Sequence, residues 1–424
     1  MASSDRRAFL KWASAAPLLG YLAAGSLWNT VRAAASKTAG SNIYERIGVR
    51  PFINARGTWT YLSGSLELPE VRAAKQEAAG HFVDMFELQR AVGKRLAELS
   101  GAESGMVTSG AAGAMASATA ACIAGADPEK VWQLPDTTGL KSEVVMFGGR
   151  SAFDSAIRLA GGKLVLAKTH DDLKSAIGGN TAMVYTTALG ERLEKAQAIA
   201  KEARVPLLMD DAAGIPPIEN LKLYAKMGID LYTFSGGKGL RGPQCSGLLL
   251  GRKDLIEAAL ANTSPWEGAV CRPMKVGKEE IMGCLAAVEA WMKMDLNALN
   301  RQWEVAVKRI QKLVDTVPGV TTEMRIPEGG NRYPTLTVSW DEEAWGFTVS
   351  DCDRQLREGN PRIEVLTSNN PSLVPAVTGG DAKTPRRADR LQIVSMTLQP
   401  AEDLTVGQRL REILNAARKK PGRG

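Results

Sequence analysis

The sequence has few of the residues that build metal centres and disulfide scaffolds. Its 424 residues include only two histidines, His81 and His170, which argues against a histidine-rich metal site. The five cysteines show no Cys-x-x-Cys spacing and are odd in number, so neither a zinc ribbon nor a disulfide framework is expected. These thiols are most simply interpreted as buried small apolar residues.

Long hydrophobic runs and a strong charge imbalance are also missing. The mean hydropathy is −0.14, which excludes a protein with many membrane spans. The net charge is +7, of which residues 1–35 hold +3, with four basic residues against one acidic residue. A second basic cluster lies at the end of the chain, and the body between the two is close to balanced. We therefore expect no nucleic-acid partner.

The first residues resemble a twin-arginine export signal. Arg6 and Arg7 are followed by a spacer and Phe-Leu-Lys, then by a mostly apolar stretch over 12–28 and a run of small residues. This order predicts a signal at 1–35, a periplasmic or otherwise exported protein, and the twin-arginine export machinery as a partner. The apolar stretch is short and contains Pro17, so a cleaved signal is favoured over a retained membrane anchor.

From residue 88 onward, apolar runs alternate with amphipathic helical segments. This alternation predicts an α/β fold with a largely parallel sheet covered on both faces. After residue 265, two long helices and several short strands predict a smaller α+β domain. Strands are expected at 104–108, 143–147, 163–167, 181–187, 205–209, 229–234 and 246–250, and then at 333–340, 361–366 and 390–397. The predicted organisation is a signal at 1–35, an N-terminal arm at 36–75, a large domain at 76–264, a small domain at 265–417 and a basic tail at 418–424.

The first candidate binding segment is Thr-Ser-Gly-Ala-Ala-Gly at 108–113, between a strand and an alanine-rich helix. Ligands bind at the carboxyl ends of parallel strands, and a helix start offers unpaired N–H groups to an anion. The segment contains neither Gly-Lys-Ser/Thr nor Gly-x-Gly-x-x-Gly, so it does not indicate a nucleotide-binding loop. Taken alone, it is explained equally well as a tightly packed helix start.

Two acids and a lysine follow two later strands. Asp210 and Asp211 come directly after the apolar strand 205–209, where carboxylates are costly unless they are paired or used, although one of them can be only a cap or turn residue. Lys238 lies between glycines after the strand 229–234, 27 residues beyond Asp211. One strand–helix–strand crossover takes about 30 residues, so the acid and the lysine can occupy neighbouring strand ends.

A phosphate site, an acid and a lysine at strand ends match the needs of pyridoxal 5'-phosphate. The helix start takes the phosphate, the acid pairs with the ring nitrogen, and the lysine holds the aldehyde as a Schiff base. A lysine in a partly dry site loses basicity, which favours this reaction with a carbonyl.

The sequence resembles the fold-type I pyridoxal-phosphate enzymes, in the selenocysteine synthase-like branch that includes D-glucosaminate-6-phosphate ammonia lyase. The resemblance runs over 43–417 and implies their fold, with a mainly parallel seven-stranded sheet in the large domain and a smaller α+β C-terminal domain. It is carried by the segments 51–60, 82–85, 101–103, 107–114, 211–213, 235–244 and 272–276.

This resemblance implies roles for individual residues. Lys238 is the cofactor lysine and proton carrier, and Asp211, rather than Asp210, is the partner of the ring nitrogen. The phosphate and the rest of the cofactor are assigned to Ser109, Gly110, Ala111, Ser235 and Arg272. The resemblance also implies a homodimer or higher homo-oligomer. Many fold-type I enzymes stack an aromatic side chain or histidine on the cofactor ring. The loop 148–153 has no obvious residue for this at the expected place, which leaves Arg150 and His81 as candidates.

The reaction implied by the resemblance is α,β-elimination from an amino acid or amino-sugar acid, as in an ammonia lyase, with Lys238 taking the α-proton. Arg56 and Arg241 are candidates for the substrate carboxylate, and Thr58 and Tyr61 for lining the site. Transamination and racemisation need the same core residues and stay open. A non-catalytic binding protein on the same scaffold is the alternative from another class.

Overall fold

The computed structural model describes residues 42–368 and 389–419, so the predicted signal at 1–35 and most of the basic tail lie outside the described residues. The chain divides into two compact units between Phe52 and Ile53. The described part of the first unit contains one short helix, η1 (Glu45–Ile47). Within the described ranges, no helix combines the length and the apolar character needed to cross a bilayer.

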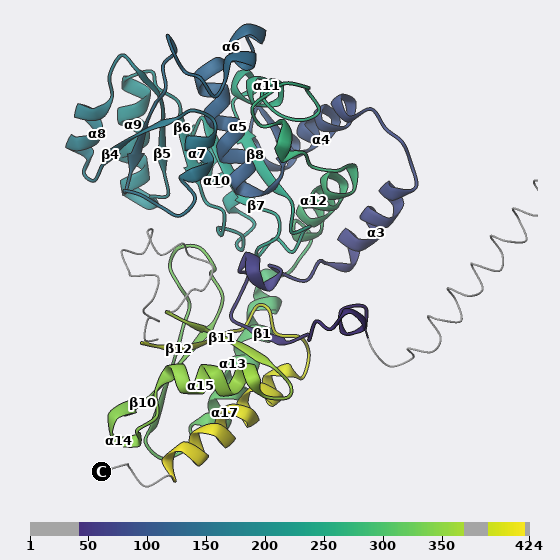
Figure 1. The fold of residues 1–424 in the computed structure, drawn as a ribbon, viewed down its shortest axis with the longest axis vertical. Helices are drawn as coiled ribbons and strands as arrows, with labels where there is room; N and C mark the ends of the chain where they lie inside the picture. The colour runs from purple at the N-terminus through teal and green to yellow at the C-terminus, as the bar shows by residue number, and fades with distance from the viewer. Residues whose placement is uncertain (1–41, 369–388, 420–424) are drawn as a thin grey trace, which may run out of the picture. The chain divides into compact units, whose positions relative to one another are not determined.

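A seven-stranded sheet forms the centre of the larger α/β part (Figure 1). Its strand order is β2-β8-β7-β6-β5-β3-β4, and all strands run parallel except β8, which is antiparallel to both of its neighbours. The strands are β2 (Ser104–Thr108), β3 (Glu143–Phe147), β4 (Lys163–Ala167), β5 (Thr181–Thr186), β6 (Leu207–Asp210), β7 (Leu231–Ser235) and β8 (Gly247–Gly251). The predicted mainly parallel seven-stranded sheet is therefore confirmed.

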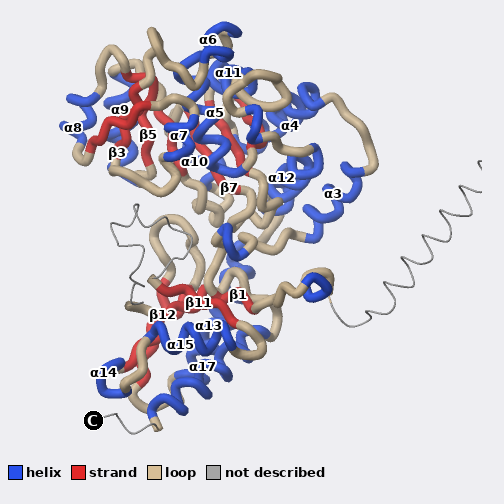
Figure 2. Tube along the Cα trace, in the orientation of Figure 1, coloured by secondary structure: helices blue, strands red, loops and turns tan. Residues whose placement is uncertain are grey.

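Helices cover both faces of this sheet (Figure 2). One face carries α5 (Gly110–Ala124), α6 (Pro128–Gln133), α7 (Ser155–Leu159) and α11 (Lys253–Ala261). The other face carries α3 (Pro69–Ala79), α4 (Met85–Ser100), α8 (His170–Ala176), α9 (Gly190–Glu202), α10 (Asn220–Lys226) and α12 (Lys278–Trp291). Twelve of the 15 residues of α5 are buried, as expected for a helix that is apolar or small on every side.

A second sheet of five strands, in the order β1-β11-β12-β10-β9, forms the smaller α+β part. Its strands are β1 (Ile53–Ala55), β9 (Val320–Arg325), β10 (Thr335–Trp340), β11 (Ile363–Thr367) and β12 (Leu391–Val394). Helices α13 (Leu296–Val314), α15 (Val349–Glu358) and α17 (Glu402–Arg418) supply most of the helical side of its core. The short elements η2 (Thr60–Leu62), η3 (Arg272–Met274) and α14 (Glu342–Trp345) complete the described structure.

Two strands of the smaller sheet were not predicted from the sequence. β1 has three residues, too few for a periodic pattern, and pairs in parallel with β11 more than 300 residues later. β9 is an edge strand whose side chains are intermediate or exposed along its whole length. Neither segment carries the apolar run on which the strand predictions rested.

The cysteines are all free, but the expectation that all five are buried is wrong. Cys271, Cys284 and Cys352 are buried, Cys122 is partly buried, and Cys245 is exposed. Burial raises the pKa of the Cys284 thiol to about 12, which makes this group inert at neutral pH. Cys245 differs because it lies in the loop that carries Lys238, outside the sheet core.

Candidate active site

Two strands of the large sheet end, and a third begins between them, beside the start of α5. Gly247, the first residue of β8, lies between Thr108 of β2 and Ser235 of β7 in the strand register. A Cβ atom at position 247 would lie 2.4 Å from the carbonyl carbon of Gly110. Only glycine therefore lets the start of α5 lie this close to the sheet.

The start of α5 is open and rich in unpaired donors. Ser109 is the N-cap residue, and its side chain makes no capping hydrogen bond to the helix. A Cβ atom at Gly110 would meet no other atom within 4 Å, so there is space beside this turn. Ser109, Gly110 and Ala111 thus present backbone N–H groups and the positive end of the helix dipole, which suits a phosphate.

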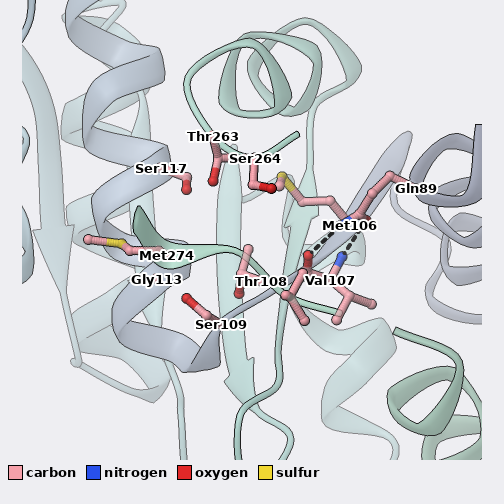
Figure 3. A pocket seen from close by; sticks show the side chains of 11 residues that line it. Gln89, Met106, Val107, Thr108, Ser109, Gly113, Ser117, Thr263, Ser264 and Met274 are labelled. Carbon is pink, nitrogen blue, oxygen red and sulfur yellow. Dashed lines mark hydrogen bonds between the residues drawn. The ribbon is translucent and has the colours of Figure 1, made fainter. Parts of the chain in front are cut away.

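A small polar cavity lies behind this helix start (Figure 3). Hydroxyl residues line it from both sides: Thr108 at the end of β2, the N-cap residue Ser109 and Ser117 of α5 on one side, and Thr263 and Ser264 from the segment after α11. The buried Gln89 of α4 fixes one wall, because its side-chain amide donates to the carbonyl of Val107 at 2.8 Å and accepts from the N–H of Val107 at 3.1 Å. The end of β2 is therefore held in place just before Ser109.

The two acids at the end of β6, Asp210 as its last residue and Asp211 directly after it, lie on opposite faces of the sheet. Side chains alternate along β6, with Leu208 in the core on the α5 side and Met209 in the core on the other side. Asp210 continues this alternation onto the α5 side, where Tyr185 donates its hydroxyl to Asp210 Oδ2 at 2.8 Å. Asp211 lies on the other side and accepts a hydrogen bond from the hydroxyl of Tyr224 at 2.7 Å.

Both carboxyl groups are strongly buried, with 9% of Asp210 and 8% of Asp211 exposed. Burial raises the pKa of each carboxyl group, while the tyrosine hydrogen bond and the positive charge of Lys238 oppose the rise. For Asp211, the neighbouring charge of Asp210 raises the pKa further. The site thus holds two carboxylates in unequal surroundings beside one lysine.

Lys238 lies half-buried in the loop between β7 and β8. Burial lowers the pKa of its amine, and the negative charges of Asp210 and Asp211 oppose part of this shift. A lowered pKa raises the share of neutral amine, which is the form that attacks a carbonyl and accepts a proton. The structure therefore brings the lysine and the two acids together, as the spacing of the sequence indicates.

Neighbouring segments hold this loop rigidly. The indole N–H of Trp291, in α12, donates to the carbonyl of Leu240 at 2.8 Å. The backbone N–H of Ser65 donates to the carbonyl of Gly237 at 3.0 Å, next to Lys238 itself. The lysine is thus presented on a backbone that is fixed from two sides, as a precisely oriented reactive group requires.

The four predicted substrate residues lie at two places. Arg56 is buried after β1, where its Nη1 donates to the carbonyl of Val365 at 2.7 Å, and its guanidinium carbon lies 5.8 Å from the ring centre of Tyr61. Thr58 forms a side-chain hydrogen bond with Tyr333. Arg241 follows the lysine loop, and its Nε donates to the carbonyl of Leu66 at 3.0 Å. Both arginines support backbone segments here, and substrate binding by these residues stays a prediction.

Arg272 begins η3, close to the polar cavity that Met274 helps to line. Its Nη2 lies 3.3 Å from the carboxylate of Glu267. Its Nε is buried and has no hydrogen-bond partner among the described residues. A buried donor without a partner costs about 1–3 kcal/mol. A bound anion that accepts a hydrogen bond from this nitrogen would remove that cost.

Sequence reasoning missed one aromatic residue near the lysine. The centre of the Phe153 ring lies 5.9 Å from Lys238 Nζ, and 56% of this residue is exposed. Of the two candidates proposed for ring stacking, Arg150 pairs with Asp154 and His81 is exposed. Phe153 lies in the same loop as Arg150, and its proximity to Lys238 appears only once the chain is folded.

Comparisons with known proteins agree with this geometry. Residues 166–339 match the family model described as Aminotransferase class-V. D-glucosaminate-6-phosphate ammonia lyase of Salmonella typhimurium is 30% identical over 339 residues, which cover 76% of this chain and 88% of that enzyme. The 5'-C-glycyluridine monooxygenase-decarboxylase of a Streptomyces species is 32% identical over 339 residues, which cover 76% and 83%. A solved structure of D-glucosaminate-6-phosphate ammonia-lyase has a TM-score of 0.72 and 28% identity, covering 89% of this chain and 99% of that one.

The chain belongs to the fold-type I pyridoxal-phosphate enzymes. The expected fold, the expected cofactor and the expectation of an enzyme are thereby confirmed. The roles of individual site residues, the export signal and the oligomeric state are not addressed by these comparisons and stay predictions.

The residues of the site fit the cofactor of this enzyme family. The open start of α5, with Ser109, Gly110, Ala111 and Ser235, would hold the phosphate, and Lys238 would bind the aldehyde. The buried hydroxyl of Thr233 has no hydrogen-bond partner among the described residues, as in a site that a polar ligand completes. When bound, pyridoxal phosphate draws electrons from the carbon beside the substrate nitrogen, so that this carbon loses a proton more easily.

Proposed function

We propose that the protein is a pyridoxal-phosphate-dependent lyase that eliminates a group from the β-carbon of an amino acid or amino-sugar acid. The observation that carries this proposal is the half-buried amine of Lys238 beside two buried carboxylates. The ammonia lyase of Salmonella typhimurium, which matches most of the chain, supports elimination as the reaction.

In this proposal, Lys238 is the general base. Burial lowers the pKa of its amine, so the neutral form is available to accept the α-proton of the substrate. A carboxylate at the end of β6 would accept a hydrogen bond from the protonated ring nitrogen of the cofactor and so favour its electron-withdrawing form. The rigid loop holds the amine in one place, so the proton that it accepts can be delivered to a leaving group nearby.

A second reaction class is favoured by the Streptomyces relative, whose name describes a monooxygenase and decarboxylase. The same base and carboxylates would serve an enzyme that consumes oxygen and releases the substrate carboxylate as carbon dioxide. Transamination would release neither ammonia nor carbon dioxide. Measuring the released products therefore distinguishes these reactions.

The first experiment uses protein made without residues 1–35, its visible absorbance spectrum, and borohydride. We expect a yellow protein whose cofactor is trapped on Lys238, no trapping in Lys238→Ala, and normal trapping in Lys222→Ala, an exposed lysine of the same domain. Release of ammonia and a keto acid from amino acids or amino-sugar acids would support the lyase. A colourless protein that stays colourless with added pyridoxal phosphate would support the non-catalytic binding protein.

We also propose that the protein is exported by the twin-arginine route and works as a homodimer or larger homo-oligomer. The paired arginines Arg6 and Arg7 support the route. Replacing both with lysine should keep the full-length protein in the cytoplasm, as seen by cell fractionation. Mass analysis of the exported protein decides between a cleaved signal and a retained anchor, and light scattering measures the oligomer.

A further inference from the structure

Two tyrosine–aspartate pairs flank the end of β6. Tyr185 donates to Asp210 at 2.8 Å, and Tyr224 donates to Asp211 at 2.7 Å. The two pairs have similar geometry and burial, so they look equivalent when the contacts alone are considered. They differ in the face of the sheet on which they lie.

The α5 face carries the groups that suit the cofactor. Ser235 and the open start of α5 lie on this face, and Thr233 is the register partner of Asp210 in β7, so the two side chains share a face. The hydroxyl of Thr233 is fully buried and lacks a partner among the described residues. A polar group bound beside Asp210 would satisfy this hydroxyl.

The opposite face is filled by protein. Tyr224 lies in a cluster of aromatic rings, with ring centres 5.5 Å from Tyr232 and 6.0 Å from Phe234. All three rings belong to the core below α4, α10 and α12. The Asp211 carboxylate, bonded to Tyr224, is therefore directed toward this packed aromatic core.

We propose that Tyr185 is a positioning residue that holds Asp210 as the carboxylate facing the cofactor ring, while Tyr224 and Asp211 form a supporting pair on the other face. This reading replaces the Asp211 assignment that the family resemblance implies. It rests on cofactor binding and does not depend on which reaction the enzyme catalyses.

The contacts explain how Tyr185 acts through its partner. The Tyr185 hydroxyl donates to Oδ2 of Asp210, and the backbone N–H of Ala212 donates to Oδ1 at 3.1 Å. Two donors stabilise the ionised carboxylate and oppose the effect of burial, which raises its pKa. An ionised carboxylate can then accept the proton-bearing ring nitrogen as a third donor.

The charged and titratable groups around this pair come from several elements. The positive charge of Lys238, from the loop after β7, lowers the pKa of Asp210. Asp211 follows Asp210 in the chain, and the charge of Asp210 raises the pKa of Asp211. Tyr185 also faces Asp154, and Ser151 forms a side-chain hydrogen bond with it. Asp154 is paired with Arg150 and Arg158, which partly neutralise its charge.

The test compares Tyr185→Phe with its matched control Tyr224→Phe in the purified holoenzyme. Each change removes one hydroxyl that donates to one aspartate. We expect Tyr185→Phe to increase the rate of cofactor loss on dialysis by roughly ten- to hundredfold, because a hydrogen bond to a charged group is lost. We also expect it to shift the pH midpoint of the visible band of the bound cofactor, with Tyr224→Phe matching the wild type in both readouts.

A second pair of variants covers the case in which a tyrosine variant does not fold. Asp210→Asn should speed cofactor loss and shift the visible band, whereas Asp211→Asn should change neither. The reverse pattern, or no change in Tyr185→Phe and Asp210→Asn, would overturn the proposal. Neither readout needs a substrate, so failure to find lyase activity would refute the proposed reaction and leave this assignment standing.

Discussion

A single methyl group on the sheet should displace the start of α5 and weaken the cofactor site. In Gly247→Ala, the new Cβ would lie 2.4 Å from the carbonyl carbon of Gly110, and 2.7 Å from both the Gly110 oxygen and the Ala111 nitrogen. All three are backbone atoms, so no side chain can rotate away to make room.

The magnitude follows from these distances. An ordinary contact begins at 3.4 Å, so the helix start must move by about 1 Å from its position 2.4 Å away. Overpacking of this kind costs about 1–3 kcal/mol of unfolding free energy. A displacement of about 1 Å at a reacting site can cost about a hundredfold in rate. We therefore expect cofactor affinity to fall by roughly tenfold or more, because the displaced N–H groups are those that face the phosphate.

The assay combines urea unfolding with titration of pyridoxal phosphate, followed by visible absorbance. Gly178→Ala is the matched control, because Gly178 is exposed and a Cβ there would meet nothing within 4 Å. We expect the control to behave like the wild type or to be slightly more stable. If the affinity of Gly247→Ala for the cofactor is within twofold of the wild-type value and its urea midpoint is unchanged, the close packing of α5 on β8 is not required for cofactor binding.

Three further predictions concern the surroundings of the site. Gln89→Ala should lower the free energy of unfolding, measured in urea, by about 1–3 kcal/mol, because the N–H and carbonyl of Val107 lose their buried partner. A decrease of less than about 0.5 kcal/mol would contradict this expectation. Asp211→Asn should gain stability over the wild type as pH rises from 4 to 8 in thermal unfolding. Because the pKa of Asp211 is raised in the folded state, the folded wild type holds a proton on this group that the unfolded chain has already lost, and it loses stability as that proton dissociates with rising pH. If the difference in stability between Asp211→Asn and the wild type does not change with pH, the raised pKa is not its cause. Arg272→Ala should lower the affinity for pyridoxal phosphate by roughly tenfold in the absorbance titration, because it removes the buried donor Nε. Lys222→Ala should leave this affinity unchanged.

The local chemistry of the site was predictable because each part follows a strand directly in the sequence. The 27-residue spacing from Asp211 to Lys238 matches one crossover, and the structure connects β6 to β7 in this way through α10. The helix start at Ser109 was recognisable from small residues after an apolar strand. These signals are local, and local backbone preferences fix them.

Contacts between distant segments were not predictable in the same way. Phe153 and Lys238 are 85 residues apart, and nothing in the loop 148–153 shows that its aromatic ring lies near the amine. The exposed position of Cys245 has the same origin, because a thiol after a glycine-rich loop looks like any small apolar residue in the sequence.

By itself, the sequence determined the α/β class, the seven strands of the large sheet, and the placing of a small-residue helix start, two acids and a lysine at strand ends. The tertiary structure alone decided which acid faces which side of the sheet. Two adjacent carboxylates look alike in a sequence, but the alternation of side chains along β6 sends Asp210 toward α5 and Asp211 toward the aromatic core. The two carboxyl groups differ in their surroundings because different helices and side chains pack on the two faces of the sheet.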